Sequence, residues 1–238
     1  MTIDQTETMQ AVADNRRYTR VAIALHWAIA ALVLYNLSSG LLREFLPRGF
    51  FTYHVSSGIT ILLLTVVRVV WRLTHKPPAF LPMKRWEANL AHGVHFLLYA
   101  AMVLIPLSGW ALISSSPPVG SPGAAYAFEK QVARAQAEGR PAPKPRSPRM
   151  FWDLAPIPMI GPIAQMGSTA EGVPEQAELH EKIETAHKIG GWLMLLLLIL
   201  HIGGALKHQF ADRLPQLARM GLGRARPGNQ ASEGSDRA

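Results

Sequence analysis

The sequence predicts an all-α fold: an integral membrane four-helix bundle with a long periplasmic loop between helices 3 and 4. Four apolar segments, at residues 21–42, 54–73, 90–114 and 186–206, are each long enough, at about 20 residues, to cross a hydrocarbon core of about 30 Å. Hydrophobic residues make up 49% of the 238-residue chain and charged residues only 17%, and the stretches between the four segments are polar, basic or rich in proline. Four such lengths in one small chain favour membrane spans over buried helices of a soluble protein.

The first two apolar segments each carry one histidine near an end. The first, VAIALHWAIAALVLYNLSSGLL, follows Arg16, Arg17 and Arg20 and places His26 about two turns inside the membrane. The second, TYHVSSGITILLLTVVRVVWRL, has His54 near its beginning. Because consecutive spans cross the membrane in opposite directions, His26 is expected near the inner face and His54 near the outer face.

The third apolar segment begins with His92 and His95 and leads into a long connection, residues 115–178. The first half of this connection is rich in proline and alanine, and a short amphipathic helix is expected near Tyr126–Glu138. The stretch MFWDLAPIPMIGPIAQ that follows is apolar but interrupted by prolines. It cannot form a regular spanning helix, so we expect it to lie against the outer surface of the bundle.

Histidines recur through the fourth apolar segment and its flanks, from Leu179 to His208. His187 and His201 are fourteen residues apart, which at about 100° and 1.5 Å per residue places them on nearly one helix face and about 21 Å apart along the axis. Each therefore lies near one membrane surface. Histidine in hydrocarbon is costly, so it indicates either hydrogen bonds to neighbouring helices or bonds to a metal.

Depth matching combines these histidines into two pairs, His26 with His201 near the inner surface and His54 with His187 near the outer one. Two neutral imidazoles that face each other across an iron, in a dry slot between helices, ligate a b-type haem. The sequence therefore predicts two noncovalently bound haem b groups, with these four histidines as ligands of the haem irons. His180, seven residues before His187, is an alternative outer ligand, although its spacing and apolar depth fit less well.

Further residues near the pairs are candidates for contacts with a haem propionate or a quinone headgroup. Haem propionates need cationic or hydrogen-bonding partners, but basic residues at helix ends also serve membrane topology alone. No catalytic residue is assigned beyond the haems themselves. The candidate contacts are His95, His92, Arg20, Arg72 and His208.

Composition and charge exclude several other classes of site. The chain has no cysteine, which excludes disulfides, iron–sulfur clusters, thiolate zinc sites and the covalent attachment of c-type haem. The net charge is +8, but the basic residues gather at helix ends and in tails and do not interleave with aromatic residues. Membrane orientation explains them, and no nucleic-acid partner is expected.

The distribution of lysine and arginine predicts that both termini are cytoplasmic. The N-terminal flank, the connection between the second and third segments and the C-terminal tail hold most of the basic residues in short loops, and such loops face the cytoplasm. The predicted organisation is a cytoplasmic segment over residues 1–18, a four-helix di-haem cytochrome b domain over 19–210 that includes the periplasmic loop 115–178, and a basic cytoplasmic tail over 211–238.

The sequence resembles the bacterial cytochrome b561 family, small four-helix di-haem proteins that share their domain with the cytochrome b subunits of nickel-iron hydrogenases. The resemblance covers all four helices and rests on ALHW around His26, HVSSGITILLLTVVRVVWRL from His54, LAHGVHFLLYAAMVLIPLSGW in the third segment and HKIGGWLMLLLLILHIGGALKHQF in the fourth. It implies a multi-pass protein of the bacterial inner (plasma) membrane, in which His26, His54, His187 and His201 ligate the haems. The loop between the third and fourth helices is longer than in compact family members.

The resemblance implies transmembrane electron transfer through two b-type haems, between superoxide or another one-electron donor and the ubiquinone pool. Family members include a superoxide oxidase, so a superoxide:ubiquinone oxidoreductase activity is one expectation. The implied partners are membrane lipid, quinone and a periplasmic redox partner protein. Two alternatives remain open. One is a cytochrome b subunit that anchors a periplasmic hydrogenase or dehydrogenase and passes its electrons to quinone; the other is a proton-coupled transporter, which the lack of broken inverted repeats disfavours.

Overall fold

The computed structural model of the chain describes residues 18–78, 83–214 and 216–222. Of the predicted N-terminal segment, residues 1–18, only Tyr18 belongs to the described residues. The predicted tail, residues 211–238, is described as far as Leu222 except for residue 215, and its remainder lies outside the described residues.

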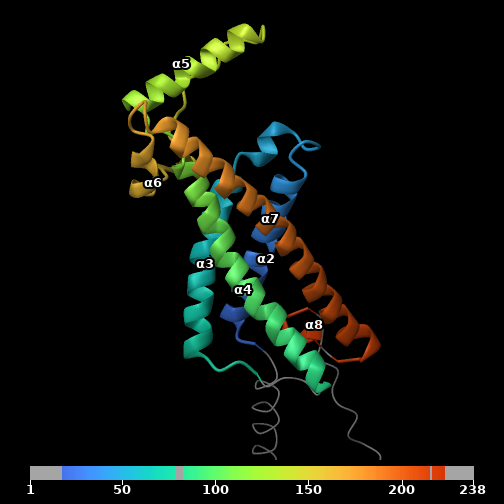
Figure 1. Cartoon of the computed structure of the whole chain (residues 1–238). Helices are drawn as coiled ribbons and strands as arrows, with labels where there is room; N and C mark the ends of the chain where they lie inside the picture. Colours follow the sequence, from blue (N-terminus) through green and yellow to red (C-terminus); the bar gives the residue numbers. More distant parts are fainter. Residues whose placement is uncertain (1–17, 79–82, 215, 223–238) are drawn as a thin grey trace, which may run out of the picture.

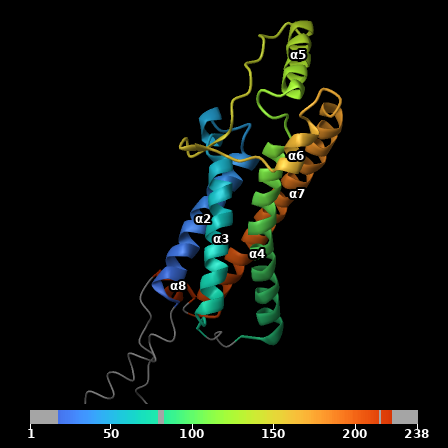
Figure 2. The same ribbon diagram turned by 90° about the vertical axis from the view of Figure 1, so that its left-hand side faces the viewer.

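Four long helices form the body of the molecule and run side by side in both views (Figures 1 and 2). Each is long and apolar enough to cross a membrane, which confirms the prediction of four spanning helices. The helices are α2 (Arg20–Leu41), α3 (His54–Thr74), α4 (Arg85–Ser114) and α7 (Val173–Leu206).

Local sequence signals explain where these helices begin and end. Thr19 caps α2, because its side-chain oxygen accepts a hydrogen bond from the backbone N–H of Ala22 at 3.2 Å,. Glu87 accepts a bond from the backbone N–H of Lys84 at 3.2 Å and so closes the first turn of α4,. The helix α3 ends at Thr74, three residues before Pro77, in agreement with the restriction that proline places on the residue preceding it,.

The helix α7 is longer than the predicted fourth segment, residues 186–206, because it begins at Val173. Its additional turns are polar and include two ion pairs at i,i+4 spacing, Glu178 with Lys182 and Glu184 with Lys188. Such pairs stabilise an exposed helix modestly. The connection between the third and fourth spanning helices is correspondingly shorter than the predicted range 115–178 and ends at Gly172.

The bundle packs in the order α2, α3, α4, α7, and α2 meets α7 over a smaller contact than any consecutive pair. Its buried apolar core lies midway along the helices and consists of Ile29, Val33, Ile61, Ala101, Met194 and Leu197. Large apolar side chains on the opposite faces stay exposed, among them Leu63, Val66 and Val70 of α3. A surface of this kind suits contact with lipid tails.

The long connection has secondary structure of its own, including two short strands. The chain is therefore mostly, but not entirely, α-helical. The helix α5 (Pro122–Ala137) matches the predicted amphipathic helix and projects away from the end of the bundle that holds His54 (Figure 1). Two short strands pair antiparallel, with Met150 opposite Pro156. The elements not yet introduced are η1 (Arg48–Phe51), β1 (Met150–Phe151), β2 (Ala155–Pro156), α6 (Gly161–Met166), the π-helical turn η2 (Lys207–Ala211) and α8 (Gln216–Arg219).

The apolar, proline-interrupted stretch lies against α3 and α4. The backbone N–H of Trp152 donates to Ser56 Oγ at 2.9 Å, and its indole N–H donates to Thr60 Oγ1 at 3.0 Å. Further along, Trp110 donates to the carbonyl oxygen of Pro158 at 2.7 Å. Residues 150–158 therefore cover the sides of α3 and α4 at the His54 end of the bundle.

Candidate functional site

The four histidines predicted as ligands lie in two facing pairs, one toward each end of the bundle. The ring centroids of His26 and His201 are 6.2 Å apart, with an angle of 64° between the ring planes. Those of His54 and His187 are also 6.2 Å apart, at 76°. In each pair one histidine comes from α7 and the other from a different helix, α2 or α3.

These separations fit two imidazoles bound to opposite sides of one metal ion. A metal–imidazole bond is about 2.0 Å long and an imidazole nitrogen lies about 1.15 Å from its ring centroid, so two rings across one metal have centroids about 6.3 Å apart. The observed 6.2 Å matches this value in both pairs. The chemistry of the donor set, two imidazoles in an apolar bundle without any cysteine, is that of a noncovalent haem.

At the His54 end, each of the facing histidines has a serine hydroxyl within hydrogen-bond distance of its Nδ1. The hydroxyl of Ser39 donates to the carbonyl of Asn36, so it accepts a hydrogen bond from His54 Nδ1 at 2.8 Å. Ser108 likewise donates to the carbonyl of Ile105 and accepts from His187 Nδ1 at 2.9 Å. A hydroxyl that gives its proton to a carbonyl can only accept from Nδ1, and in that tautomer Nε2 keeps its lone pair for a metal.

Two glycines allow the backbone of neighbouring helices to touch the same imidazoles. A Cβ added to Gly40 of α2 would lie 3.2 Å from His54 Cε1, and one added to Gly109 of α4 would lie 3.1 Å from His187 Cε1. The His54 ring also stacks on Phe51, with 4.7 Å between the ring centroids. The orientation of both rings is therefore fixed by packing as well as by hydrogen bonds.

His180, the alternative ligand, is turned to a different partner. Its Nδ1 lies 2.9 Å from Ser115 Oγ and 3.2 Å from the carbonyl oxygen of Ser115, just beyond the end of α4. The structure thus brings His187 to His54, and it places His180 two turns of α7 further from the centre of the bundle.

At the opposite end a third histidine joins the pair. The ring of His95 lies 5.1 Å from that of His201, centroid to centroid, and its Nδ1 donates to the carbonyl of Ala91 at 2.6 Å. That separation is too short for two rings on opposite sides of one metal, whereas His26 and His201 have the fitting distance. His92 is exposed one turn earlier and bonds the carbonyl of Ala88.

The basic candidates are less closely tied to the pairs. Arg20 is exposed in the first turn of α2 and Arg72 in the last turn of α3, although Arg72 lies within electrostatic range of His95. Arg68 forms a contact that the sequence does not predict, because its Nε donates to the hydroxyl of Tyr99 at 2.9 Å. The sequence signal for it is an arginine within an apolar span.

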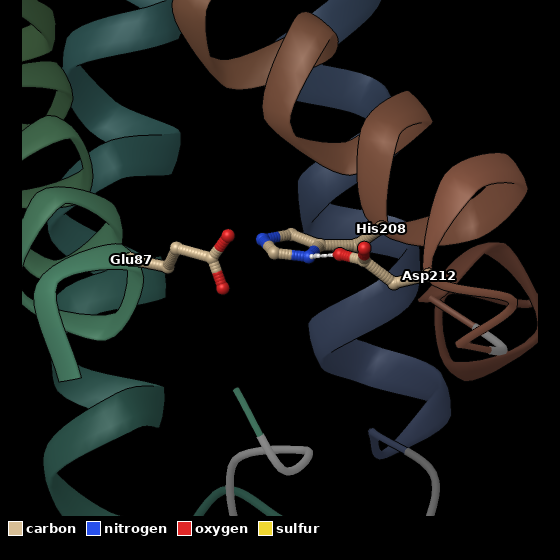
Figure 3. A group of neighbouring side chains, drawn as sticks. All are labelled: Glu87, His208 and Asp212. Carbon is tan, nitrogen blue, oxygen red and sulfur yellow. Dashed lines mark hydrogen bonds and ion pairs between the residues drawn. The ribbon is translucent and has the colours of Figure 1, made fainter. Parts of the chain in front are cut away.

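His208 belongs to a polar network that joins the start of α4 to the end of α7. Figure 3 shows its imidazole between the carboxylates of Glu87 and Asp212, and its Nδ1 is 2.6 Å from Asp212 Oδ2. Lys207 bridges the two carboxylates, at 2.5 Å from Glu87 and 2.8 Å from Asp212. These bonds hold the pKa of Asp212 below its usual value, with Lys207 as the largest cause.

Although Glu87, His208 and Asp212 have ligand atoms within 4.8 Å of one another, the ammonium of Lys207 already bonds both carboxylates. The network therefore links the start of α4 to the end of α7. We call it the clasp, and its members are Glu87, Lys207, His208 and Asp212. It also explains the position of His208, which is separated from the His26–His201 pair by two turns of helix.

Comparisons with known proteins match the chain to a family of cytochromes. A family model described as prokaryotic cytochrome b561 matches residues 17–223. A Yersinia pestis protein named probable superoxide oxidase CybB is 31% identical over 104 residues, which are 42% of this chain and 59% of that protein. Cytochrome b561 homolog 1 of Escherichia coli (strain K12) is 28% identical over 107 residues, 42% of this chain and 61% of that protein. The matched part covers less than two thirds of each of these two relatives.

A longer match exists to cytochrome b561 homolog 2 of the same Escherichia coli strain. It is 28% identical over 211 residues, which are 86% of this chain and 90% of that protein. The similarity therefore extends over the spanning helices and the connection between them.

Proposed function

The chain belongs to the prokaryotic cytochrome b561 family, whose function is transmembrane electron transfer with haem, and we propose that it passes electrons through two b-type haems from an external one-electron donor to the ubiquinone pool. The proposal rests on the two histidine pairs, in each of which the ring centroids are 6.2 Å apart. One haem would be held by His26 and His201 and the other by His54 and His187. When bound, each haem iron supplies reversible one-electron chemistry.

The protein's own residues position these groups and protect them. Ser39 and Ser108 keep Nε2 of the two histidines at the His54 end unprotonated,. Residues 150–158 pack against this end of the bundle from the side. A fixed site reduces the reorganisation that accompanies each electron transfer.

The proposed orientation places both termini in the cytoplasm, in a bacterial inner membrane. The basic residues of the N-terminal flank, the connection after α3 and the tail support it,. The His54 end is then the outer, periplasmic end, and the connection with α5 and α6 is periplasmic. His26, His95 and His201 lie toward the cytoplasm.

Superoxide is the donor that we favour, and the similarity to a protein named probable superoxide oxidase supports it. Each superoxide anion gives up one electron and leaves as dioxygen, and ubiquinone takes two electrons and two protons to become ubiquinol. Arg43 is the cation best placed to attract the anion, since its guanidinium lies 4.5 Å from the centroid of Phe51, which stacks on His54,. Lys182 and Lys188 contribute less, because each is paired with a glutamate.

A second candidate function is that of a membrane subunit that receives electrons from a periplasmic hydrogenase or dehydrogenase. The exposed helix α5, which extends beyond the bundle at the His54 end (Figure 2), favours a protein partner there. In that case reduction by superoxide would be slow and reduction by the partner fast.

Stopped-flow spectroscopy of the purified protein tests the proposal. Pyridine haemochrome assay should give two haems per chain, superoxide should reduce them, and a ubiquinone analogue should reoxidise them without another subunit. Arg43→Gln should slow the reduction by superoxide and weaken its dependence on ionic strength, whereas Arg134→Gln, on the distant helix α5, should leave both unchanged. One haem or none would refute the two-site proposal, and two haems that superoxide cannot reduce would favour the subunit function.

A further inference from the structure

Arg68 is a charged residue inside a candidate membrane span, Gly49–Thr74. It lies six residues before the end of α3, about 9 Å along the helix axis. Ile61 and Thr65, on the same helix face, are 4% and 0% exposed, so Arg68 points toward the bundle and not toward lipid. Charged residues that face the interior of a membrane bundle generally have a partner or a functional role.

The partner that the structure gives Arg68 is neutral. Its Nε donates to the hydroxyl of Tyr99 on α4 at 2.9 Å, and its guanidinium carbon lies 5.9 Å from the centroid of the Tyr99 ring. Among the described residues, no carboxylate lies within ion-pair distance of Arg68. One turn closer to the middle of the membrane, the hydroxyl of Thr65 is buried and has no hydrogen-bond partner among the described residues. Among the described residues, this region of the bundle thus holds a positive charge without a carboxylate partner and a hydroxyl without a hydrogen-bond partner.

The charge lies at the depth of the His26–His201 pair. Arg68 follows His54 on α3 by fourteen residues, the same spacing that separates His187 from His201 on α7. It interacts electrostatically with His26, His95 and His201. At the opposite end the corresponding cation, Arg43, is exposed to solvent, where water screens its charge.

We propose that Arg68, held by Tyr99, binds a carboxylate of the haem at the His26–His201 pair and raises the reduction potential of that haem above that of the other. A fixed positive charge in a medium of low dielectric stabilises the state with the additional electron. Electrons that enter at the His54 end would then run downhill toward the His26 end. The inference rests on the proposed function, because it requires a haem at each pair.

Redox titration of the purified protein tests this inference. Wild type should show two potentials, and His187→Ala, which keeps only the haem at His26 and His201, assigns one of them. In Arg68→Gln, the equilibrium constant that divides one electron between the two haems should change at least tenfold in favour of the haem at the His54 end. This change corresponds to about 59 mV for one electron. Arg68→Lys should largely restore the wild-type partition, and Tyr99→Phe should give an intermediate value.

Arg72→Gln is the matched control, because Arg72 lies on the same helix one turn further out and is exposed. It should change the partition much less than Arg68→Gln does. Unchanged potentials in Arg68→Gln would overturn the inference while leaving the two-haem proposal intact. If Arg68→Gln loses one haem, the titration of Tyr99→Phe decides, and wild-type potentials in that variant would overturn the inference. A wild type without haem at His26 and His201 would instead refute the proposed function.

Discussion

Replacing Gly109 by alanine perturbs the His54–His187 pair directly. The new Cβ would lie 3.1 Å from His187 Cε1, whereas carbon atoms in contact are normally about 3.5 to 4.0 Å apart. The ring must therefore move by about 0.4 Å or more, which is twice the tolerance of about 0.2 Å that metal–ligand distances allow. Gly40→Ala should have the same effect through His54, at 3.2 Å.

We expect both variants to bind the haem at this pair about 10 to 100 times more weakly, as do other substitutions that disturb the surroundings of a metal ligand. This range corresponds to about 1.4 to 2.8 kcal/mol. Titration of haem into the haem-free protein, followed by absorption, measures the loss. The haem at the other pair serves as an internal standard, because Gly40 and Gly109 contact neither His26 nor His201 in the structure.

Two control variants separate ligand geometry from general packing. Gly93→Ala, also in α4, meets no atom within 4 Å and should bind haem normally while gaining up to about 1 kcal/mol of helix stability. Gly190→Ala would place a Cβ 3.0 Å from Ile105 Cγ1, so it strains the bundle without touching a histidine. Wild-type haem affinity in both Gly40→Ala and Gly109→Ala would refute the assignment of His54 and His187 as ligands.

Two further predictions concern the ends of the bundle. His26→Ala or His201→Ala should remove one haem, and His54→Ala or His187→Ala the other, whereas His180→Ala should retain both because His180 bonds Ser115; haem loss in His180→Ala alone would identify it as the ligand. Lys207 and His208 hold the pKa of Asp212 below its usual 3.8, so the clasp is stabilised above about pH 4 and is lost as the pH falls through the lowered pKa. Hydrogen exchange of residues 207–222 should accelerate in that acid range, and Asp212→Asn should exchange rapidly at every pH; equal exchange in both proteins at pH 7 would contradict this role.

The sequence predicts the spanning helices well, because their signal is the length of an apolar run and needs no knowledge of neighbours. The spacing of His187 and His201 is a property of one helix, so it can be read from the sequence equally well. The extension of α7 back to Val173 has a weaker signal, namely the glutamate–lysine pairs at i,i+4 spacing. An apolar pattern overlooks those turns because they are polar.

Contacts between helices are the part that a single sequence leaves open. Ser39 with Gly40 and Ser108 with Gly109 form the same dipeptide on two helices, each serving one histidine through a hydroxyl and a missing side chain. The repetition is visible in the sequence, but its meaning depends on how α2 and α4 rotate toward their neighbours. The bond between Arg68 and Tyr99 depends on the same packing of α3 against α4.

The two proposed haem sites depend on different helix contacts. The helix α7 supplies one histidine to each pair, so its rise alone fixes their separation at about 21 Å. The partners come from α2 and α3, and α2 meets α7 over the smaller contact. The His26–His201 pair consequently relies on the end of the chain, where Trp27 of α2 donates to the carbonyl of Met220 at 2.9 Å. Since α8 also packs on η2, this short segment joins the start of α2 to the end of α7 and so keeps His26 opposite His201.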